Sequence, residues 1–220
     1  WKVHANFSAM MVGGLSSLMI QALHPRALAA VWDHSNFRHQ LKARLGRTAM
    51  FVAATTYGGV DLANQHIQRV NSIHANIRGI DLNGKPYCAN DPHLIRWVHL
   101  VETISFLTAY QHLCLLPLST AECDRYIVEM NKVGEMLGAT NLPITFNDAK
   151  NAMKQYEFEL VFDHRTRETL QSIESYSVEF TEKPFFDLIL RASFDIIPSW
   201  LMQKLEKKSD MCLLIQARRL

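Results

Sequence analysis

One segment, residues 92–114, constrains the fold of this chain more than any other. It opens with Asp91-Pro92, the pair that favours a helix N-cap followed by proline at the first helical position. Pro117 ends it, and between these points apolar side chains fall on nearly every side of the predicted helix. A helix that is apolar all round has to be surrounded by other elements. We therefore expect a central helix with further helices packed around it.

The rest of the chain also shows apolar residues at three- and four-residue steps, with little of the alternation typical of strands. Gly58-Gly59 separates a predicted helix at 37–57 from another at 60–78. Ser119 and Glu122 form a capping box for a helix to about residue 137, and one more helix is expected to about residue 160. Asn83-Gly84 predicts a tight turn in a minimal hairpin. No long linker interrupts 1–220, so we predict one all-α domain. We also expect this domain to contain a cofactor-sized pocket.

Composition excludes several classes of protein. Hydrophobic residues are 48% of the chain and charged residues 20%, which excludes a disordered tail. A net charge of +2 gives no reason to expect a nucleic-acid partner. The apolar run 9–23 is shorter than a membrane span, and we predict no transmembrane segment.

The four cysteines form no C-x-x-C pair and indicate free thiols in a reducing compartment such as the cytoplasm. Because the chain starts at Trp1, we expect a trimmed N-terminus that hides any targeting signal.

A P-loop-like segment, Gly79–Lys85, does not carry nucleotide chemistry here. The motif requires Ser or Thr after the lysine and a strand before the loop. This chain has Pro86 at that position, and the loop follows a predicted helix. We interpret the segment as a turn.

The candidate chemistry lies on the two helices joined by Gly58-Gly59. Arg44 and His74 are nearly equidistant from that turn, so an antiparallel hairpin brings them to the same height. Arg47 and Thr48 follow Arg44 by three and four residues and share its face. A histidine opposite arginine and threonine is suited to ligate a flat metallocofactor, with arginine near an anionic edge or a bound oxygen species.

Other interpretations remain open at this point. A histidine on an apolar stripe is more often a hydrogen-bonded core residue, and the arginines are explained as solvated groups; spacing alone favours this interpretation. His99 is a second candidate ligand, and Glu102 lies one turn later, where it could orient the imidazole. His24 is expected at a helix boundary. Residues 1–60 hold six Lys or Arg against the single acid Asp33, an excess that suits haem propionates, phosphate, an acidic partner or plain solvation.

Several short segments, in order and with plausible spacing over about residues 12–165, resemble the MpaB/rubber oxygenase (latex clearing protein-like) family. They are Gly13–Leu18, Gln21–Ala27, Asp33–Ser35, Arg44–Thr48, Thr55–Gly58, Val70–Gly79, Tyr87–Pro92, Trp97–His99 and Leu118–Tyr126. The resemblance implies an all-α fold and a b-type haem oxygenase that splits carbon–carbon double bonds with dioxygen, in polyisoprene or a prenyl-derived side chain. Its partners would be dioxygen and a hydrophobic, polyprenyl-like substrate.

By the same resemblance, His74 matches the proximal ligand of the haem iron. Arg44 and Thr48 match the arginine and threonine of the pocket, and Arg47 takes the place of a basic residue near the distal side. Arg44 and Arg47 would also contact the cofactor. These assignments agree with the hairpin geometry, which rests on spacing alone.

The sequence departs from the family pattern at one position. Rubber-cleaving members carry an acidic pocket residue upstream of the arginine, whereas the only acid before Arg44 is Asp33, and His24 falls in that region.

The sequence supports three hypotheses about the function of the protein. The first is a haem b-dependent oxygenase for an alkene-containing substrate; the second is a cofactor-free helical protein that binds a lipid-like ligand. The third is a metal-dependent hydrolase that uses His74, His99 and Glu102.

Overall fold

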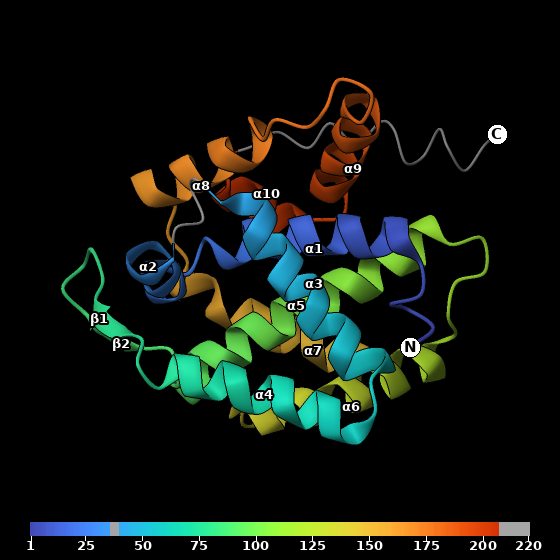
Figure 1. The fold of residues 1–220 in the computed structure, drawn as a ribbon, viewed down its shortest axis with the longest axis horizontal. Helices are drawn as coiled ribbons and strands as arrows, with labels where there is room; N and C mark the ends of the chain where they lie inside the picture. Colours follow the sequence, from blue (N-terminus) through green and yellow to red (C-terminus); the bar gives the residue numbers. More distant parts are fainter. Residues whose placement is uncertain (36–39, 207–220) are drawn as a thin grey trace.

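In the computed structural model, which describes residues 1–35 and 40–206, helix α5 (Pro92–Leu113) runs through the middle of the other helices (Figure 1). Thirteen of its residues are buried, and they lie on all of its sides. Asp91 caps the helix by accepting a hydrogen bond from the backbone N–H of His93, and Pro92 occupies the first helical position. The predicted central helix is confirmed.

The other elements surround α5, and almost all of them are helices, as the sequence predicted. In chain order they are α1 (Phe7–Gln21), α2 (Pro25–His34), α3 (Leu41–Tyr57), α4 (Val60–His74), β1 (Arg78–Ile80), β2 (Pro86–Cys88), α6 (Thr120–Leu137), α7 (Phe146–Lys154), the 3-10 helix η1 (Gln155–Glu159), α8 (His164–Glu174), α9 (Lys183–Asp195) and α10 (Ser199–Lys204).

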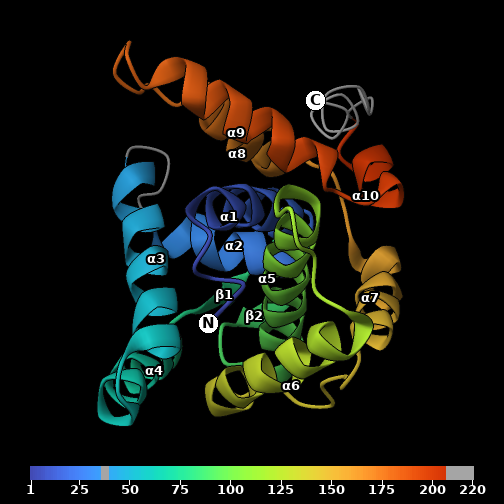
Figure 2. The same cartoon turned by 90° about the vertical axis from the view of Figure 1, so that its right-hand side faces the viewer.

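Figure 2 shows how these helices are layered. Helices α1, α2 and α5 occupy the middle, the α3–α4 pair covers one side, and α6 and α7 lie toward the opposite side and below. Helices α8, α9 and α10 lie across the top. The α3–α4 pair therefore forms an outer wall against the central helices.

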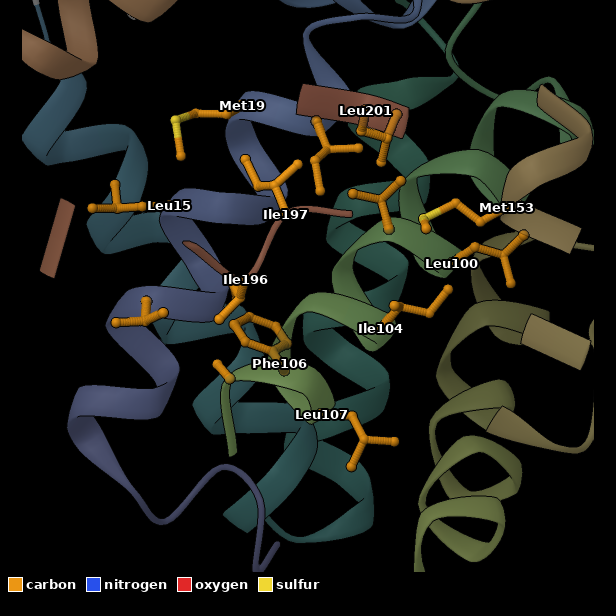
Figure 3. Close-up of a cluster of buried hydrophobic side chains, with 14 of the residues drawn as sticks. Leu15, Met19, Leu100, Ile104, Phe106, Leu107, Met153, Ile196, Ile197 and Leu201 are labelled. Carbon is orange, nitrogen blue, oxygen red and sulfur yellow. The ribbon is translucent and has the colours of Figure 1, made fainter. Parts of the chain in front are cut away.

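The main core forms where α1, α5 and the C-terminal helices meet. Figure 3 shows Leu15 and Met19 of α1 and Leu100 of α5 among these side chains, with Ile197 from the segment before α10. Each of these four is at most 5% exposed. Burial of each such side chain contributes about 1.5–3 kcal/mol to folding. The packing joins distant parts of the sequence into one core.

Gly13 brings α1 into direct contact with α5. A Cβ atom at this position would lie 2.8 Å from Cα of Phe106 and 3.0 Å from the carbonyl oxygen of Ser105. Only glycine allows the two backbones to approach this closely, because any side chain would displace one helix. No ionisable residue occurs in α1, which fits its position against the centre of the molecule.

The α3–α4 pair is the predicted antiparallel hairpin. Its turn is Gly58-Gly59, and the two helices pack along each other. The second helix ends at His74 rather than at Arg78, so the predicted boundary is wrong by four residues. Arg78 instead begins β1, which pairs antiparallel with β2. Pairing between these strands outweighs the helical pattern of the sequence at this point.

The β1–β2 pair is the predicted minimal hairpin. Asp81 accepts hydrogen bonds from the backbone N–H groups of Asn83 and Lys85, and Gly84 adopts a φ of 75°. The P-loop-like segment is therefore a tight turn between strands, as the presence of Pro86 indicated.

Two further expectations concern the helix caps and the thiols. Ser119 and Glu122 form the predicted capping box at the start of α6. Cys88, Cys114 and Cys123 carry free thiols, and Cys212 lies outside the described residues.

The membrane test gives a limited result. No single helix among the described residues is long and apolar enough to cross a membrane, and α1 and α2 pass by length and composition only as a pair bent by 103°.

Candidate functional site

Two adjoining cavities lie between the α3–α4 hairpin and the central helices. The first has a volume of about 200 Å³ and reaches α4 and α6; the second has about 540 Å³ and extends along α1 and α3. They share a wall built by α1, α3 and α5, which contains Arg44 and Glu102. The remaining lining is mostly apolar, as in most small-molecule sites. Below, the term shared wall means Arg44 and Glu102, the two charged residues at this boundary.

His74 is the last residue of α4 and lines the first cavity. Its Nδ1 atom is buried, and no described residue offers it a hydrogen bond. Burial, followed by the nearby Arg44 cation, lowers the pKa of His74 below its usual value. The imidazole is therefore neutral at physiological pH, which is the form that ligates metals.

Arg44 reaches the shared wall from α3. Its Nη1 donates a long hydrogen bond of 3.4 Å to the hydroxyl of Ser35, and no carboxylate of the described residues lies within ion-pair distance of its guanidinium. Burial, followed by repulsion from Arg47, lowers the pKa of Arg44. A half-buried cation without an ion-pair partner in the described part of the protein is a suitable place for an anionic group of a ligand.

Glu102 faces Arg44 from α5. Within the described residues its carboxyl group has neither a hydrogen bond nor an ion pair at 4 Å or less, and it lines both cavities. Burial raises the pKa of Glu102 to about 7, and the Arg44 cation opposes this rise only in part. The sequence pointed to Glu102 as a residue that could orient His99 and as a member of the metal-dependent hydrolase hypothesis, and not as a partner of Arg44. Its proximity in sequence to the Trp97–His99 segment was the only signal that could have drawn attention to it.

The other two predicted site residues occupy different positions. Thr48 lines the second cavity, on the same helix as Arg44. Arg47 is exposed and lines neither cavity. The structure therefore brings Arg44 and His74 together at the first cavity and places Thr48 beside the second. The chemical roles assigned to all four residues stay predictions.

His99 occupies a packed position on α5. Its Nε2 lies 3.3 Å from Oδ1 of Asn131, and its ring lies against Gly134, where a Cβ atom would come within 2.9 Å. Burial is the main cause that lowers the pKa of His99. This environment matches a hydrogen-bonded core histidine, and its partner is Asn131 rather than Glu102.

The region upstream of Arg44 supplies no acid to either cavity. Asp33 accepts a 2.7 Å hydrogen bond from the hydroxyl of Tyr87, and it lies 3.5 Å from a guanidinium nitrogen of Arg165. His24 is the N-cap of α2, as expected, with its Nδ1 accepting from the backbone N–H of Ala27 at 3.5 Å. Both residues have structural partners outside the cavities.

A second polar group, the Glu159 cluster, consists of His24, Arg26, His93 and Glu159. Glu159 accepts from Nε2 of His93 at 2.7 Å and from Arg26 at 3.1 Å, and Nε2 of His24 lies 3.4 Å from the same carboxylate. Burial lowers the pKa of His24 to about 4. The sequence pattern gave no indication of this cluster, because its members come from three separate segments.

Ligand atoms of His24, His93 and Glu159 lie within 4.8 Å of one another, the one such group of three among the described residues. Two contacts disfavour a metal ion there. The Ala27 N–H requires Nδ1 of His24 to accept, so the ring proton lies on Nε2, the atom a metal would need. The Arg26 cation also holds Glu159 and would repel a dication. We interpret the cluster as a structural network.

The fold and the cavities together define a class: a helical protein that exposes unpartnered polar groups to apolar cavities, as binding sites for small molecules and cofactors do. A family model described as "ER-bound oxygenase mpaB/B'/Rubber oxygenase, catalytic domain" matches residues 1–219. The chain therefore belongs to this oxygenase family. No curated protein and no solved structure gives a significant match.

Proposed function

We propose that the protein is a haem b-dependent oxygenase that acts on a hydrophobic, alkene-containing substrate by oxidative cleavage of the double bond. The observation that carries the proposal is the unpartnered Nδ1 of His74, a neutral imidazole beside the unpaired Arg44 in an apolar cavity. Membership of the oxygenase family supports it independently.

The residues present fit a haem group in their chemistry. His74 would hold the iron, and Arg44 supplies a cation for a propionate or for charge on bound oxygen. The first cavity by itself is smaller than the roughly 300–1,000 Å³ of ordinary ligand pockets, whereas the adjoining one falls within that range. A haem held by His74 would therefore occupy more space than the first cavity provides. Bound haem would supply the activation of dioxygen.

The chain's own residues would then orient the reactants and exclude water. Met10, Met11 and Leu45 line the second cavity with apolar surface that suits a hydrocarbon chain. Thr48 adds a hydroxyl beside that chain, close to Arg44 on α3. Phe106 contributes apolar surface to both cavities. The substrate class and the roles of these residues are part of the proposal.

The first experiment measures haem and iron on protein purified after growth with a haem supply. We expect a Soret band, and we expect His74→Ala to lose it while circular dichroism shows an unchanged helical content. His99→Ala is the matched control: it removes another buried imidazole that lines the first cavity, and it should keep the iron. Loss of haem in His99→Ala with retention in His74→Ala would move the ligand to α5 and refute the assignment.

A second candidate function is a cofactor-free protein that binds a lipid-like ligand, favoured by the larger apolar cavity. It predicts bound lipid by mass spectrometry, no iron, and full ligand retention in His74→Ala. The metal-dependent hydrolase has less support, because His74, His99 and Glu102 do not form a three-ligand group among the described residues. Iron without porphyrin would favour it.

We also propose a reducing compartment for the protein, supported by the free thiols of Cys88, Cys114 and Cys123. Alkylation of the protein in freshly lysed cells tests this: the thiols should be labelled without prior reduction.

A further inference from the structure

Opposite Arg44, the shared wall presents a carboxyl group that has no partner among the described residues. Glu102 extends from the central helix α5 to the point where the two cavities adjoin. A carboxylate at such a position normally has an ion pair or hydrogen-bond donors, because an isolated charge in apolar surroundings is costly. Glu102 has none among the described residues, and it is therefore directed at space that a ligand would fill.

We propose that Glu102 is a ligand-binding acid of this site: its carboxyl group, in the protonated form, donates a hydrogen bond to an oxygen acceptor on an otherwise apolar ligand. The proposal rests on the proposed function for the identity of the ligand as a substrate. It specifies the substrate class further, as a hydrocarbon chain that carries a carbonyl or ether oxygen.

The groups around Glu102 support a carboxyl that is partly protonated near pH 7 and mostly neutral below it. Arg44 from α3 favours the ionised form, yet burial outweighs it and raises the pKa of Glu102 to about 7. Burial also raises the pKa of Tyr126 on α6, with a smaller contribution from Glu102, so this phenol is neutral. Burial lowers the pKa of His99, one turn earlier on α5, and of His74 on α4.

One more titratable group near Glu102 comes from the N-terminal residues that precede helix α1. His4 lines the second cavity together with Glu102, and its Nε2 is hydrogen-bonded to the Tyr126 hydroxyl at 2.9 Å. Burial lowers the pKa of His4 to about 4, so it carries no charge at neutral pH. Helix α1, which forms the remaining part of the wall, has no ionisable residue. Arg44 is therefore the one cation that faces Glu102 from the described elements around it.

A protonated carboxyl and an ionised one bind different ligands. The neutral form donates one hydrogen bond, whereas the carboxylate only accepts. An acceptor-only ligand such as an ester therefore binds to the neutral form and is rejected by the ionised one. A hydrocarbon without oxygen is insensitive to the difference.

The experiment compares methyl oleate with cis-9-octadecene, two chains of similar length of which only the first carries acceptor oxygens. Binding is measured by calorimetry from pH 6 to pH 8 on the purified protein, with and without haem. We expect methyl oleate to bind more weakly as pH rises through about 7. Glu102→Gln should remove this pH dependence and keep the affinity, because the amide still donates. Glu102→Ala should lower it about 10-fold, and cis-9-octadecene should be unaffected throughout.

Infrared spectroscopy gives a second readout that needs no ligand. The C=O band of a protonated carboxyl should titrate with a midpoint near pH 7, and Glu102→Gln should remove it. Glu135→Gln, which changes an exposed glutamate on α6, is the matched control and should keep the band.

Two results overturn the proposal: equal affinity of Glu102→Ala and the unmodified protein for methyl oleate, or affinity that increases with pH. These failures are distinct from failure of the proposed function. A protein without haem that still shows the Glu102-dependent binding retains this site and loses the oxygenase assignment. A haem-loaded protein in which Glu102→Ala changes nothing retains the oxygenase assignment and loses this site.

Discussion

Two polar regions of this protein are built from similar residues and differ in whether those residues have partners. The Glu159 cluster joins His93, Arg26 and a carboxylate through contacts of 2.7 and 3.1 Å. At the shared wall, Arg44 has a single 3.4 Å hydrogen bond to Ser35 and no ion pair, Glu102 has no partner among the described residues, and Nδ1 of His74 lacks a hydrogen bond. In the Glu159 cluster, only Nε2 of His24 lacks a hydrogen bond, and it lies 3.4 Å from the Glu159 carboxylate. Buried polar groups are normally satisfied, so unpartnered groups that line an apolar cavity indicate where a ligand belongs, whereas a connected cluster indicates a structural role.

The largest effect should come from the shared wall. Arg44→Ala removes a preorganised cation, and we expect turnover per haem to fall about 100- to 1,000-fold in an oxygen-uptake assay with unsaturated lipids. Haem content should change much less than turnover. Arg47→Ala on the same helix is the matched control: this residue is exposed and lines neither cavity, so its replacement should leave turnover and the Soret position nearly unchanged.

Equal turnover per haem in Arg44→Ala and the unmodified protein would show that the pocket assignment is wrong. A large loss in Arg47→Ala would show that this side chain reaches the ligand by a rearrangement of α3.

Acid should be the next largest perturbation, and it acts on two buried histidines: His4 beside the second cavity and His24 in the Glu159 cluster. Burial lowers the pKa values of His4 and His24 to about 4 from 6.5. Above pH 6.5 both are neutral whether the protein is folded or unfolded, and their full contribution to stability is present. As pH falls from about 6.5 to about 4, only the unfolded chain takes up these protons. The free energy of unfolding should therefore fall by up to about 3 kcal/mol for each histidine.

Urea unfolding at pH 7 and at pH 4.5 measures this loss. The control is the double variant His4→Gln, His24→Asn, in which asparagine keeps the N-cap of α2 and neither position titrates. Its stability should depend less on pH than that of the unmodified protein; an identical slope would contradict the assignment.

The smallest of these effects concerns the satisfied region. Glu159→Ala leaves Arg26 and His93 without their common acceptor, and we expect a loss of about 1–2 kcal/mol in the free energy of unfolding, since the carboxylate is partly exposed. Glu157→Ala is the matched control, because this residue makes one contact with Lys154. Turnover per haem should be unchanged in both variants. A loss of turnover in Glu159→Ala would show that the Glu159 cluster also contributes to activity and does not have a structural role alone.

The sequence predicted those features that depend on local spacing. The helix pattern, the Gly58-Gly59 turn and equal distances from it were enough to place Arg44 and His74 beside the same cavity. The caps at Asp91 and Ser119 followed from single residues and their neighbours. These features depend on residues close together in the sequence, so they can be predicted before the tertiary structure is known.

Features that depend on tertiary contacts could not be predicted in this way. Helix α4 ends at His74 because β1 pairs with β2, a contact that helical periodicity does not reveal. The direction of Arg47 depends on how α3 packs against α4 and the rest of the molecule. Glu102 gains its importance only from the elements packed around it, since its own sequence neighbours indicated a partner for His99.

The contact between Gly13 and Phe106 has a consequence for how a ligand enters. Two helices whose backbones touch cannot separate or slide without breaking the core, and α5 holds thirteen buried residues. In the hairpin opposite, Ile67 is the one buried residue of α4, and few residues of α3 are buried. Segments with few buried contacts open at lower free energy. The α3–α4 hairpin is therefore the wall of the cavities expected to open at the lowest free energy, and Arg44 and His74, which it carries, would then move together away from Glu102.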